Sequence, residues 1–301
     1  MDSPLHSIKI GTVVRGNHDT PNTIKAILPH GFESFQITFG RNLSLGNLAE
    51  LAARVKDKIG DAVISAVGIY GNPIEHGPDD VETLRGWERL IDEAHLFGTD
   101  VVSGFTGRIR NRPIEESLPP FKKVFGELAQ RAEGNGVRIA FENCSMGGDW
   151  HSGDWNIAHT PTHWNMMFNE VASDNLGLEW EPCHQMVALI DPIPQIRKYG
   201  HKFFHIHGKD ATVRWDVLEE HGIVGNVPFA FHRTPGFGDC DWTRVISELR
   251  LVGFRGSIDI EGWHDPVYRD ELEMTGQVQA LGHLKTCRGG DGFIANPIPT
   301  E

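Results

Sequence analysis

The chain has 301 residues, 39% of them hydrophobic and 23% charged, and its 28 basic and 41 acidic residues give a formal net charge of −13. Such an acidic chain lacks the basic footprint of a general nucleic-acid binder, so we expect a small, roughly neutral substrate and no nucleic-acid partner. Four scattered cysteines, an N-terminal region without an apolar leader, and no apolar run near 20 residues predict a cytoplasmic protein without a membrane span.

Short apolar, β-branched runs alternate with amphipathic stretches along the chain. The runs are bounded by Gly, Pro, Asn or Asp, which is typical of strands. We expect strands at 8–14, 32–39, 62–69, 101–106, 137–144, 175–182, 202–209 and 256–263. Apolar residues at three- and four-residue spacing predict helices within 45–60, 79–98, 119–136, 241–254 and 272–287. Candidate helix N-caps are Asp79, Thr160 and Asp241.

Strict strand–helix alternation predicts a parallel sheet. Eight units without a linker favour an α/β fold with a single (β/α)8 TIM barrel over residues 1–301, ending in an irregular C-terminal tail at 286–301. The rival fold, a doubly wound open sheet, usually has a GxGxxG turn after its first strand, whereas "RGNHDTPN" follows the first strand here. The long segments at 70–80, 144–160 and 211–240 follow strands, so a barrel places them on its catalytic face.

Ionisable residues stand at or near the C-terminal ends of the last four expected strands. In chain order they are Glu142, then Glu179 and Glu181, then His205, His207 and Lys209, then Asp259 and Glu261. These strand ends converge in a barrel, where close carboxylates repel one another unless a cation lies between them. Carboxylates with one imidazole suit a hard or borderline divalent ion, with Mn²⁺ as the first choice and Mg²⁺ or Co²⁺ as alternatives.

The motifs "FENCSMGG", "NLGLEWEPCH", "FFHIHGKD", "TPGFGDCDW" and "IDIEGWHDPVY" resemble the sugar phosphate isomerase/epimerase family, the xylose isomerase-like TIM barrels, over about residues 100–290. The resemblance implies that the metal ligands are Glu142, Glu181, His207 and Glu261. The family usually has Asp at the second position. The extra methylene of Glu181 leaves Glu179 open as an alternative ligand.

Four further residues are candidates for substrate binding. The resemblance gives His184 of "EPCH" a contact with the substrate. Lys209 either holds a substrate oxygen or pairs with a carboxylate. His205 lies one inward position deeper than His207, where it either orients a ligand or packs in the core. Arg233 opens a Gly- and Pro-rich stretch, which we expect to cover the substrate.

The expected function follows from the ligand set and the resemblance. A metal-bound enediolate would let Glu142 and Glu261 remove and return a proton at a carbon beside a carbonyl. We therefore expect a divalent-metal-dependent isomerase or epimerase of a keto-sugar or related polyol. Its partner would be a small carbohydrate, and the chain itself would form a homo-oligomer.

Other functions stay open. Some lyases that resemble this family cleave 3-keto glycosides with the help of a small partner subunit, and the loop with Trp150, His151 and Trp155 would then accept an aromatic aglycone. Abasic-site DNA cleavage on the same barrel is less favoured, because of the −13 charge and the shortage of further histidine ligands. A non-catalytic sugar-binding role carries similarly little weight.

Overall fold

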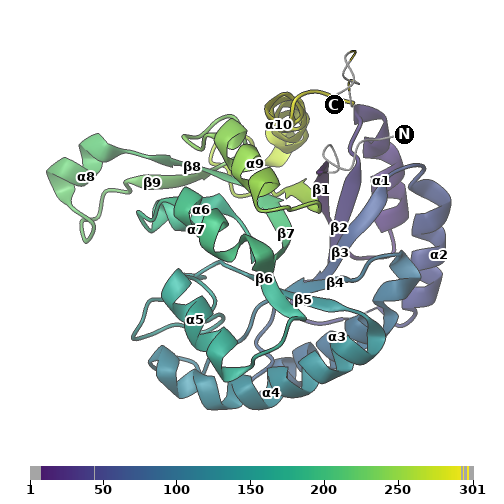
Figure 1. Ribbon diagram of the computed structural model, residues 1–301, viewed down its shortest axis with the longest axis vertical. Coiled ribbons are helices and arrows are strands. Elements are labelled where there is room, and N and C mark those ends of the chain that lie inside the picture. The colour runs from purple at the N-terminus through teal and green to yellow at the C-terminus, as the bar shows by residue number, and fades with distance from the viewer. Residues whose placement is uncertain (1–7, 44, 293, 295–296, 298–301) are drawn as a thin grey trace.

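Eight parallel strands close into a barrel in the computed structural model, which describes residues 8–43, 45–292, 294 and 297. Consecutive barrel strands are neighbours, and β1 closes the barrel by pairing with β10 (Figure 1). The strands are β1 (Lys9–Arg15), β2 (Ser34–Thr38), β3 (Val63–Ile69), β4 (Val101–Gly104), β5 (Arg138–Glu142), β6 (Leu176–Trp180), β7 (Phe203–Gly208) and β10 (Ser257–Ile260). Each overlaps one expected stretch, and the prediction of a (β/α)8 barrel is confirmed.

Helices surround the barrel on its outside (Figure 1). They are α1 (Thr20–Ile27), α2 (Leu48–Lys58), α3 (Pro78–Glu93), α4 (Ile114–Asn135), α5 (Pro161–Glu170), α6 (Pro182–Val187), α7 (Pro192–Tyr199), α9 (Trp242–Leu251) and α10 (Glu273–Arg288). Helix α2 buries an apolar stripe formed by Leu48, Leu51, Ala52 and Val55. Burying one such large apolar side chain contributes roughly 1.5–3 kcal/mol.

Aromatic side chains fill the layer between the sheet and helices α3 and α4. Phe125 packs edge-to-face against Trp87, with ring centroids 5.6 Å apart, and against Phe141 of β5, at 4.8 Å. All three residues are fully buried. This packing holds the outer face of β5, the strand that ends at Glu142.

The three expected N-caps have different outcomes. Asp241 caps α9 by accepting a hydrogen bond from the backbone nitrogen of Arg244 at 3.0 Å. Thr160 occupies the N-cap position of α5 without a side-chain capping bond. Asp79 lies inside α3, so its expected role is wrong. The N-cap there is Gly77, whose backbone nitrogen donates to the Asp80 side chain at 2.9 Å.

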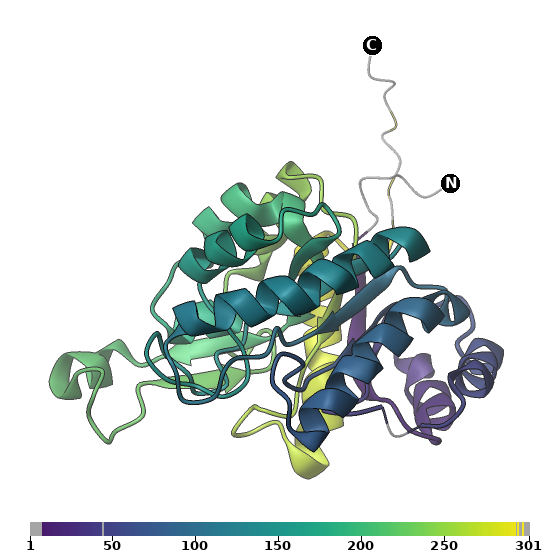
Figure 2. The ribbon, with the colours of Figure 1, turned by 90° about the horizontal axis from the view of Figure 1, so that it is seen from below.

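An arm projects from the barrel where the sequence predicted only a loop at 211–240. It consists of the antiparallel strands β8 (Asp210–Val213) and β9 (Ala230–Arg233) with helix α8 (Trp215–His221) at its far end. Figures 1 and 2 show the arm extending away from the body of the barrel. Four-residue strands are too short to give a clear alternating pattern, which explains why the sequence did not reveal them.

The C-terminal helix ends one residue later than the expected range 272–287. Helix α10 continues to Arg288, three residues into the segment that was predicted to be an irregular tail from 286 onward. It ends at Gly289, whose φ of 106° is a conformation that favours glycine. Most of the remaining expected tail, at 293, 295–296 and 298–301, lies outside the described residues.

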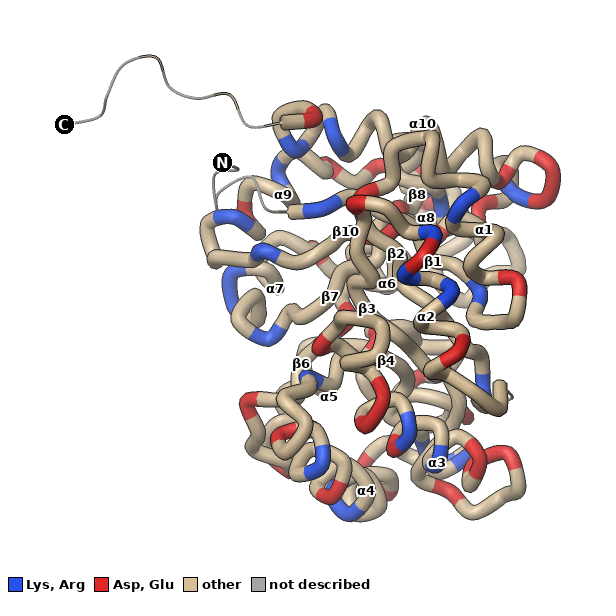
Figure 3. Tube along the Cα trace, turned by 90° about the vertical axis from the view of Figure 1, so that its right-hand side faces the viewer, with Lys and Arg blue, Asp and Glu red and all other residues tan. Residues whose placement is uncertain are grey.

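The outer surface carries charges of both signs. Figure 3 shows Lys and Arg interspersed with Asp and Glu along α3 and α4. Arg89 pairs with Glu93 at 2.7 Å, and Arg131 pairs with Asp92 at 2.6 Å. Across the described residues, no helix has both the length and the apolar character needed to cross a bilayer.

Candidate metal centre

The C-terminal ends of four barrel strands bring four ionisable side chains together. Glu142 ends β5, Glu181 directly follows β6, His207 lies in β7, and Glu261 directly follows β10. All four are buried, and one ligand atom from each lies within 4.8 Å of the others. We call this group the carboxylate–histidine cluster. It consists of the same four residues that the resemblance implied as metal ligands.

Burial makes several negative charges difficult to hold in the cluster. It raises the pKa of Glu142 to about 8, and the charges of Glu181 and Glu261 add to this against the opposing effect of His207. Burial also acts on Glu181, but the positive charges of His184 and Lys209 outweigh it and lower the pKa of Glu181 to about 2. One carboxyl therefore keeps a proton beside ionised neighbours, and a divalent cation is suited to replace that proton.

The hydrogen bonding of the cluster fits a metal. Among the described residues, Oε2 of Glu181 and Nδ1 of His207 are buried without a hydrogen-bond partner, and Oε1 of Glu181 has only Nε2 of His184 beside it, at 2.6 Å. That Nδ1 lies 3.6 Å from Oε1 of Glu142 and 3.6 Å from Oε2 of Glu261. Unpaired buried polar atoms cost roughly 1–3 kcal/mol each. A divalent cation would satisfy them together, and three carboxylates with one imidazole suit Mn²⁺, Mg²⁺ or Co²⁺.

Glu179 has a different environment from Glu181, although the two lie on one face of the chain. Oε2 of Glu179 accepts a hydrogen bond from the Tyr70 hydroxyl at 2.6 Å, and Oε1 accepts one from the Gln36 amide at 2.5 Å. Glu179 does come within 4.8 Å of ligand atoms of His205 and His207. The oxygens of Glu179 already accept hydrogen bonds, however, whereas Oε2 of Glu181 has no hydrogen-bond partner among the described residues and Oε1 has only a close contact with Nε2 of His184, at 2.6 Å. The structure therefore favours Glu181 as the fourth cluster ligand.

His205 lies below the cluster and not in the substrate cavity. Its Nε2 is 2.8 Å from Oδ2 of Asp259, its Nδ1 is 2.9 Å from Oε1 of Glu179, and it is 1% exposed. Burial lowers the pKa of His205, but these two carboxylates outweigh it and leave the pKa raised. His205 is not among the residues that line the cavity, so a contact with the substrate is not supported. His205 instead supports Glu179, which in turn holds Gln36 against His207.

A cavity of about 740 Å³ opens above the cluster. Glu142, His207 and Glu261 form part of its floor. Apolar side chains from the first half of the chain face them, namely Val13, Phe39, Tyr70 and Phe105. The volume falls in the range of small-molecule sites, and the mix of an apolar wall and a few polar groups is typical of them.

Two of the expected substrate residues line this cavity. Nε2 of His184 lies 2.6 Å from Oε1 of Glu181. Nζ of Lys209 donates to Oε2 of Glu261 at 2.9 Å and lies 3.8 Å from Oε2 of Glu181. Burial lowers the pKa of Lys209, but the carboxylates outweigh it and raise the pKa well above its usual range. Both side chains are placed to reach a substrate, and their contact with one stays a prediction.

Arg233 does not line the cavity, so its expected substrate contact is not supported. Its Nε donates to Oδ2 of Asp265 at 3.1 Å, and the same oxygen accepts from the backbone nitrogen of Thr234 at 2.8 Å. Arg233 thereby fastens the base of the arm to the loop after β10. The adjacent His232 lines the cavity instead, because neighbouring residues of a strand point to opposite faces.

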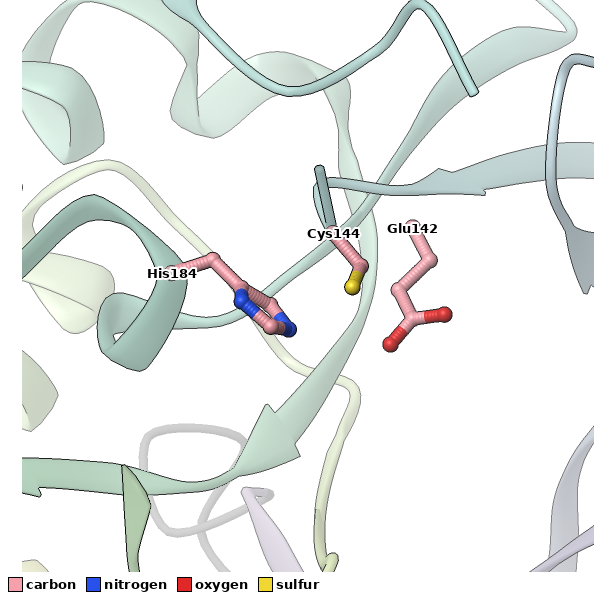
Figure 4. Close-up of side chains that lie close together, drawn as sticks. All are labelled: Glu142, Cys144 and His184. Atoms are coloured by element: carbon pink, nitrogen blue, oxygen red, sulfur yellow. The ribbon is translucent and has the colours of Figure 1, made fainter. Parts of the chain in front are cut away.

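Cys144 is a neighbour of the cluster that the sequence did not suggest. Its Sγ belongs to a second potential ligand group with Glu142 and His184, all within 4.8 Å (Figure 4). Figure 4 shows Glu142 and Cys144, from the end of β5 and the residues after it, facing His184 of α6. Burial raises the pKa of the Cys144 thiol well above its usual range. Because the thiolate is the metal-binding form, the carboxylate–histidine cluster is the better-suited site for a hard cation.

The aromatic residues of the loop at 144–160 lie outside the cavity of about 740 Å³. Trp155 stacks under the guanidinium of Arg41, 4.2 Å from the ring centroid. Trp150 packs on His163, with centroids 5.1 Å apart, and His151 is exposed. These positions do not support an aromatic aglycone held over the cluster, so the lyase alternative is not favoured.

Comparisons with known proteins agree with this fold. A model of the family described as xylose isomerase-like TIM barrel matches residues 24–287. The rhizopine catabolism protein MocC of Rhizobium meliloti is 26% identical over 213 residues, which cover 66% of this chain and only 60% of MocC. The uncharacterized protein YfiH of Bacillus subtilis (strain 168) is 22% identical over 250 residues, covering 72% of this chain and 76% of YfiH.

Solved structures of sugar epimerases have the same architecture. The 3-keto-D-glucoside 4-epimerase YcjR from E. coli superimposes with a TM-score of 0.66 at 16% identity, covering 93% of this chain and 100% of that one. An L-ribulose 3-epimerase superimposes with a TM-score of 0.68 at 16% identity, covering 93% of this chain and 96% of the epimerase. A D-psicose 3-epimerase in the presence of D-fructose superimposes with a TM-score of 0.68 at 15% identity, covering 94% of this chain and 100% of the epimerase. At these identities the likeness shows the shared fold.

Proposed function

This chain belongs to the xylose isomerase-like TIM-barrel family, and from that premise we propose that it is a divalent-metal-dependent epimerase or isomerase of a keto-sugar or related polyol. The observation that carries the proposal is the convergence of Glu142, Glu181, His207 and Glu261, with buried atoms that lack hydrogen-bond partners among the described residues. The sugar epimerases among the structural neighbours support the same class of substrate.

The residues of the cluster have separate tasks. Glu142, Glu181, His207 and Glu261 would hold the ion, with Mn²⁺ as our first choice. When bound, a divalent cation supplies Lewis-acid polarisation of a substrate carbonyl and its neighbouring hydroxyl, which acidifies the C–H bond between them. The four side chains are buried, and burial strengthens each electrostatic contact among them.

We assign the proton transfer to Glu142 and Glu261, and their positions support this. The two residues come from strands that are separated in the barrel by β6 and β7, and each has an oxygen 3.6 Å from Nδ1 of His207. A substrate carbon between them would have one carboxylate on each side. One carboxylate would take the proton, and the other would return it to the opposite face or to the neighbouring carbon. Lys209 keeps Glu261 ionised for the first step.

Hydrogen exchange at carbon tests this function even when the identity of the product is unknown. The Mn²⁺-loaded protein is incubated in D₂O with a panel of ketohexoses, ketopentoses and 3-keto-glucosides, and deuterium at carbon is followed by NMR and mass spectrometry. We expect deuterium incorporation with at least one member of the panel. Exchange should be lost in Glu142→Gln and in Glu261→Gln, and retained in Glu115→Gln, which changes an exposed residue at the start of α4.

Two results would count against the proposal. The first is full exchange activity in Glu142→Gln. The second is no exchange on any keto-sugar while metal analysis shows one Mn²⁺ per chain.

A further inference from the structure

A second cavity of about 420 Å³ lies next to the first. The two share the lining residues Ser145, His184 and Val187, so they meet at His184. The second cavity contains none of the cluster residues among its lining. It is therefore a separate space that begins where the reaction cavity ends.

Three aromatic rings form one wall of the second cavity. The His159 and His163 rings pack with centroids 4.3 Å apart, and Trp150 lies on the other side of His163 at 5.1 Å. The loop that carries Trp150 is fixed from below by Arg108, which is fully buried. Its guanidinium donates to the carbonyl oxygens of Asp149 at 2.6 Å and Trp150 at 3.2 Å. The wall is thus preformed.

The rings of this wall are uncharged at neutral pH, and the cavity lining also includes the carboxylate of Asp149, which would repel an anion. Nε2 of His159 and Nε2 of His163 are buried and have no hydrogen-bond partner among the described residues. Burial lowers the pKa of His159 to about 3 and that of His163 to about 4, so both rings are neutral at pH 7. Neutral imidazoles pair with hydroxyl groups and give no charge to hold an anion. Thr160 and Thr162 add hydroxyls to the same lining.

We propose that the substrate is a glycoside, with its reacting keto-sugar ring at the carboxylate–histidine cluster and a second, uncharged, hydroxyl-bearing ring in the cavity walled by Trp150, His159 and His163. The proposal rests on the proposed function and adds the substrate class to it. Each cavity falls within the range of small-molecule sites, which suits two linked rings better than one. The link between the rings would pass beside His184.

The side chains of the second cavity would contact different parts of the second sugar ring. The indole of Trp150 offers a flat apolar face for the C–H side of a sugar ring, while the two histidines would pair with hydroxyls at the ring edge. These contacts lie away from the reacting carbon. They would therefore act mainly on the binding of the glycoside, in the substrate complex and in the transition state alike.

Calorimetric binding to the Mn²⁺-loaded protein tests the proposal. The probes are methyl glucoside as the single-ring compound and cellobiose, maltose and trehalose as two-ring compounds, all unreactive. We expect at least one disaccharide to bind about tenfold more tightly than methyl glucoside, the factor of one good polar or stacking contact. Trp150→Ala and His163→Leu should remove this advantage. Trp155→Ala, which changes a tryptophan of the same loop outside both cavities, should keep it.

The outcomes separate this proposal from the proposed function. Equal affinity for one-ring and two-ring probes in the wild type, or an advantage that survives in both Trp150→Ala and His163→Leu, would overturn the glycoside assignment. Deuterium exchange on free keto-sugars decides the proposed function independently of that result. A thermal melt of each variant shows whether it folds. If one of Trp150→Ala and His163→Leu does not fold, the other still decides the test.

Discussion

The side-chain oxygen of Gln36 lies 2.7 Å from Nε2 of His207. The amide nitrogen of Gln36 points the other way and donates to Glu179 at 2.5 Å. Because an ionised carboxylate only accepts hydrogen bonds, the amide cannot be reversed, and His207 must carry its proton on Nε2. A glutamine on β2 thereby fixes the tautomer of a histidine on β7 and leaves the Nδ1 lone pair for the cluster.

Replacement of Gln36 should weaken metal binding although Gln36 itself is no ligand. Gln36→Leu removes the acceptor for His207, and we expect the Mn²⁺ affinity to fall roughly 10- to 100-fold, as for other residues that orient a metal ligand. Competition with a chelator measures this. The matched control is Gln195→Leu, since Gln195 is also buried with two side-chain hydrogen bonds but lies outside the site. Equal Mn²⁺ affinity in the two variants would contradict the role of Gln36.

Metal binding should stabilise the fold through Glu181 and not through Glu179. Mn²⁺ at 100 times its dissociation constant should stabilise the protein by about 2.7 kcal/mol, or roughly 5 °C in Tm. Glu181→Gln should abolish this shift. Glu179→Gln should keep a reduced shift and lower the Tm of the metal-free protein, because the hydrogen bonds from Tyr70 and Gln36, and with them the orientation of His207, are disturbed. A shift that survives in Glu181→Gln and disappears in Glu179→Gln would reverse the assignment.

Removal of the Lys209 charge should raise the Mn²⁺ affinity and lower kcat/KM for the substrate. Nζ of Lys209 is buried 2.9 Å from Glu261 and 3.8 Å from Glu181, so Lys209→Met leaves the cluster more negative. We expect tighter Mn²⁺ binding together with a loss of about tenfold or more in kcat/KM.

Lys202→Met, which changes a partly buried lysine outside the site, should alter neither quantity. Tighter metal binding with unchanged kcat/KM would mean that Lys209 only pairs with the carboxylates. Weaker metal binding in Lys209→Met would contradict the electrostatic argument itself.

The two histidines of the second cavity should make the metal-free protein sensitive to acid. Burial lowers the pKa of His159 to about 3 and that of His163 to about 4, whereas an unfolded histidine titrates near 6.5. Between these values the unfolded chain binds more protons than the folded one, so the stability that these residues contribute is complete above pH 6.5 and decreases as the pH falls. Each should cost roughly 1–2 kcal/mol of stability between pH 7 and pH 5.

Urea unfolding at the two pH values checks this expectation. The free energy of unfolding lost between pH 7 and pH 5 should be smaller in His163→Asn than in the wild type, by the roughly 1–2 kcal/mol that one such histidine contributes. It should be unchanged in His151→Asn, because His151 is exposed. The same loss in all three proteins would show that His163 is not kept neutral by the fold.

Strand–helix alternation, a local pattern, allowed the barrel to be predicted. The strand-end pattern gave a wider set of ionisable residues, and the family resemblance implied which four of them form the cluster. Alternation alone did not separate Glu179 from Glu181, since residues two apart share a face. The two glutamates differ in their hydrogen-bond partners. Glu179 accepts from Gln36 and Tyr70, which lie more than 100 positions earlier in the chain and could not be assigned to it from the local pattern.

The arm explains the error at Arg233. Its side-chain orientation depends on the register of a hairpin that the sequence did not reveal, in which Ala211 pairs with His232 and Asp210 with Arg233. A shift of one residue exchanges the two faces of a strand. His232 was therefore missed and Arg233 was chosen for the same reason, while His205 was misplaced because depth along a barrel strand depends on packing across the whole sheet.

Part of the apolar lining of the reaction cavity comes from a different region of the chain than the cluster. The four cluster residues all lie from Glu142 onward, whereas Val13, Phe39, Tyr70 and Phe105 lie before residue 106, and Met146, Val187 and Trp263 add apolar lining from the later region. A change of substrate range can therefore arise by mutation or recombination within the first third of the gene, with the acid–base and ion-binding groups inherited unchanged. Gln36 and Tyr70 are the positions of that third that such an exchange would have to preserve. Libraries directed at Val13, Phe39 and Phe105 offer a route to new specificities at little cost to the chemistry.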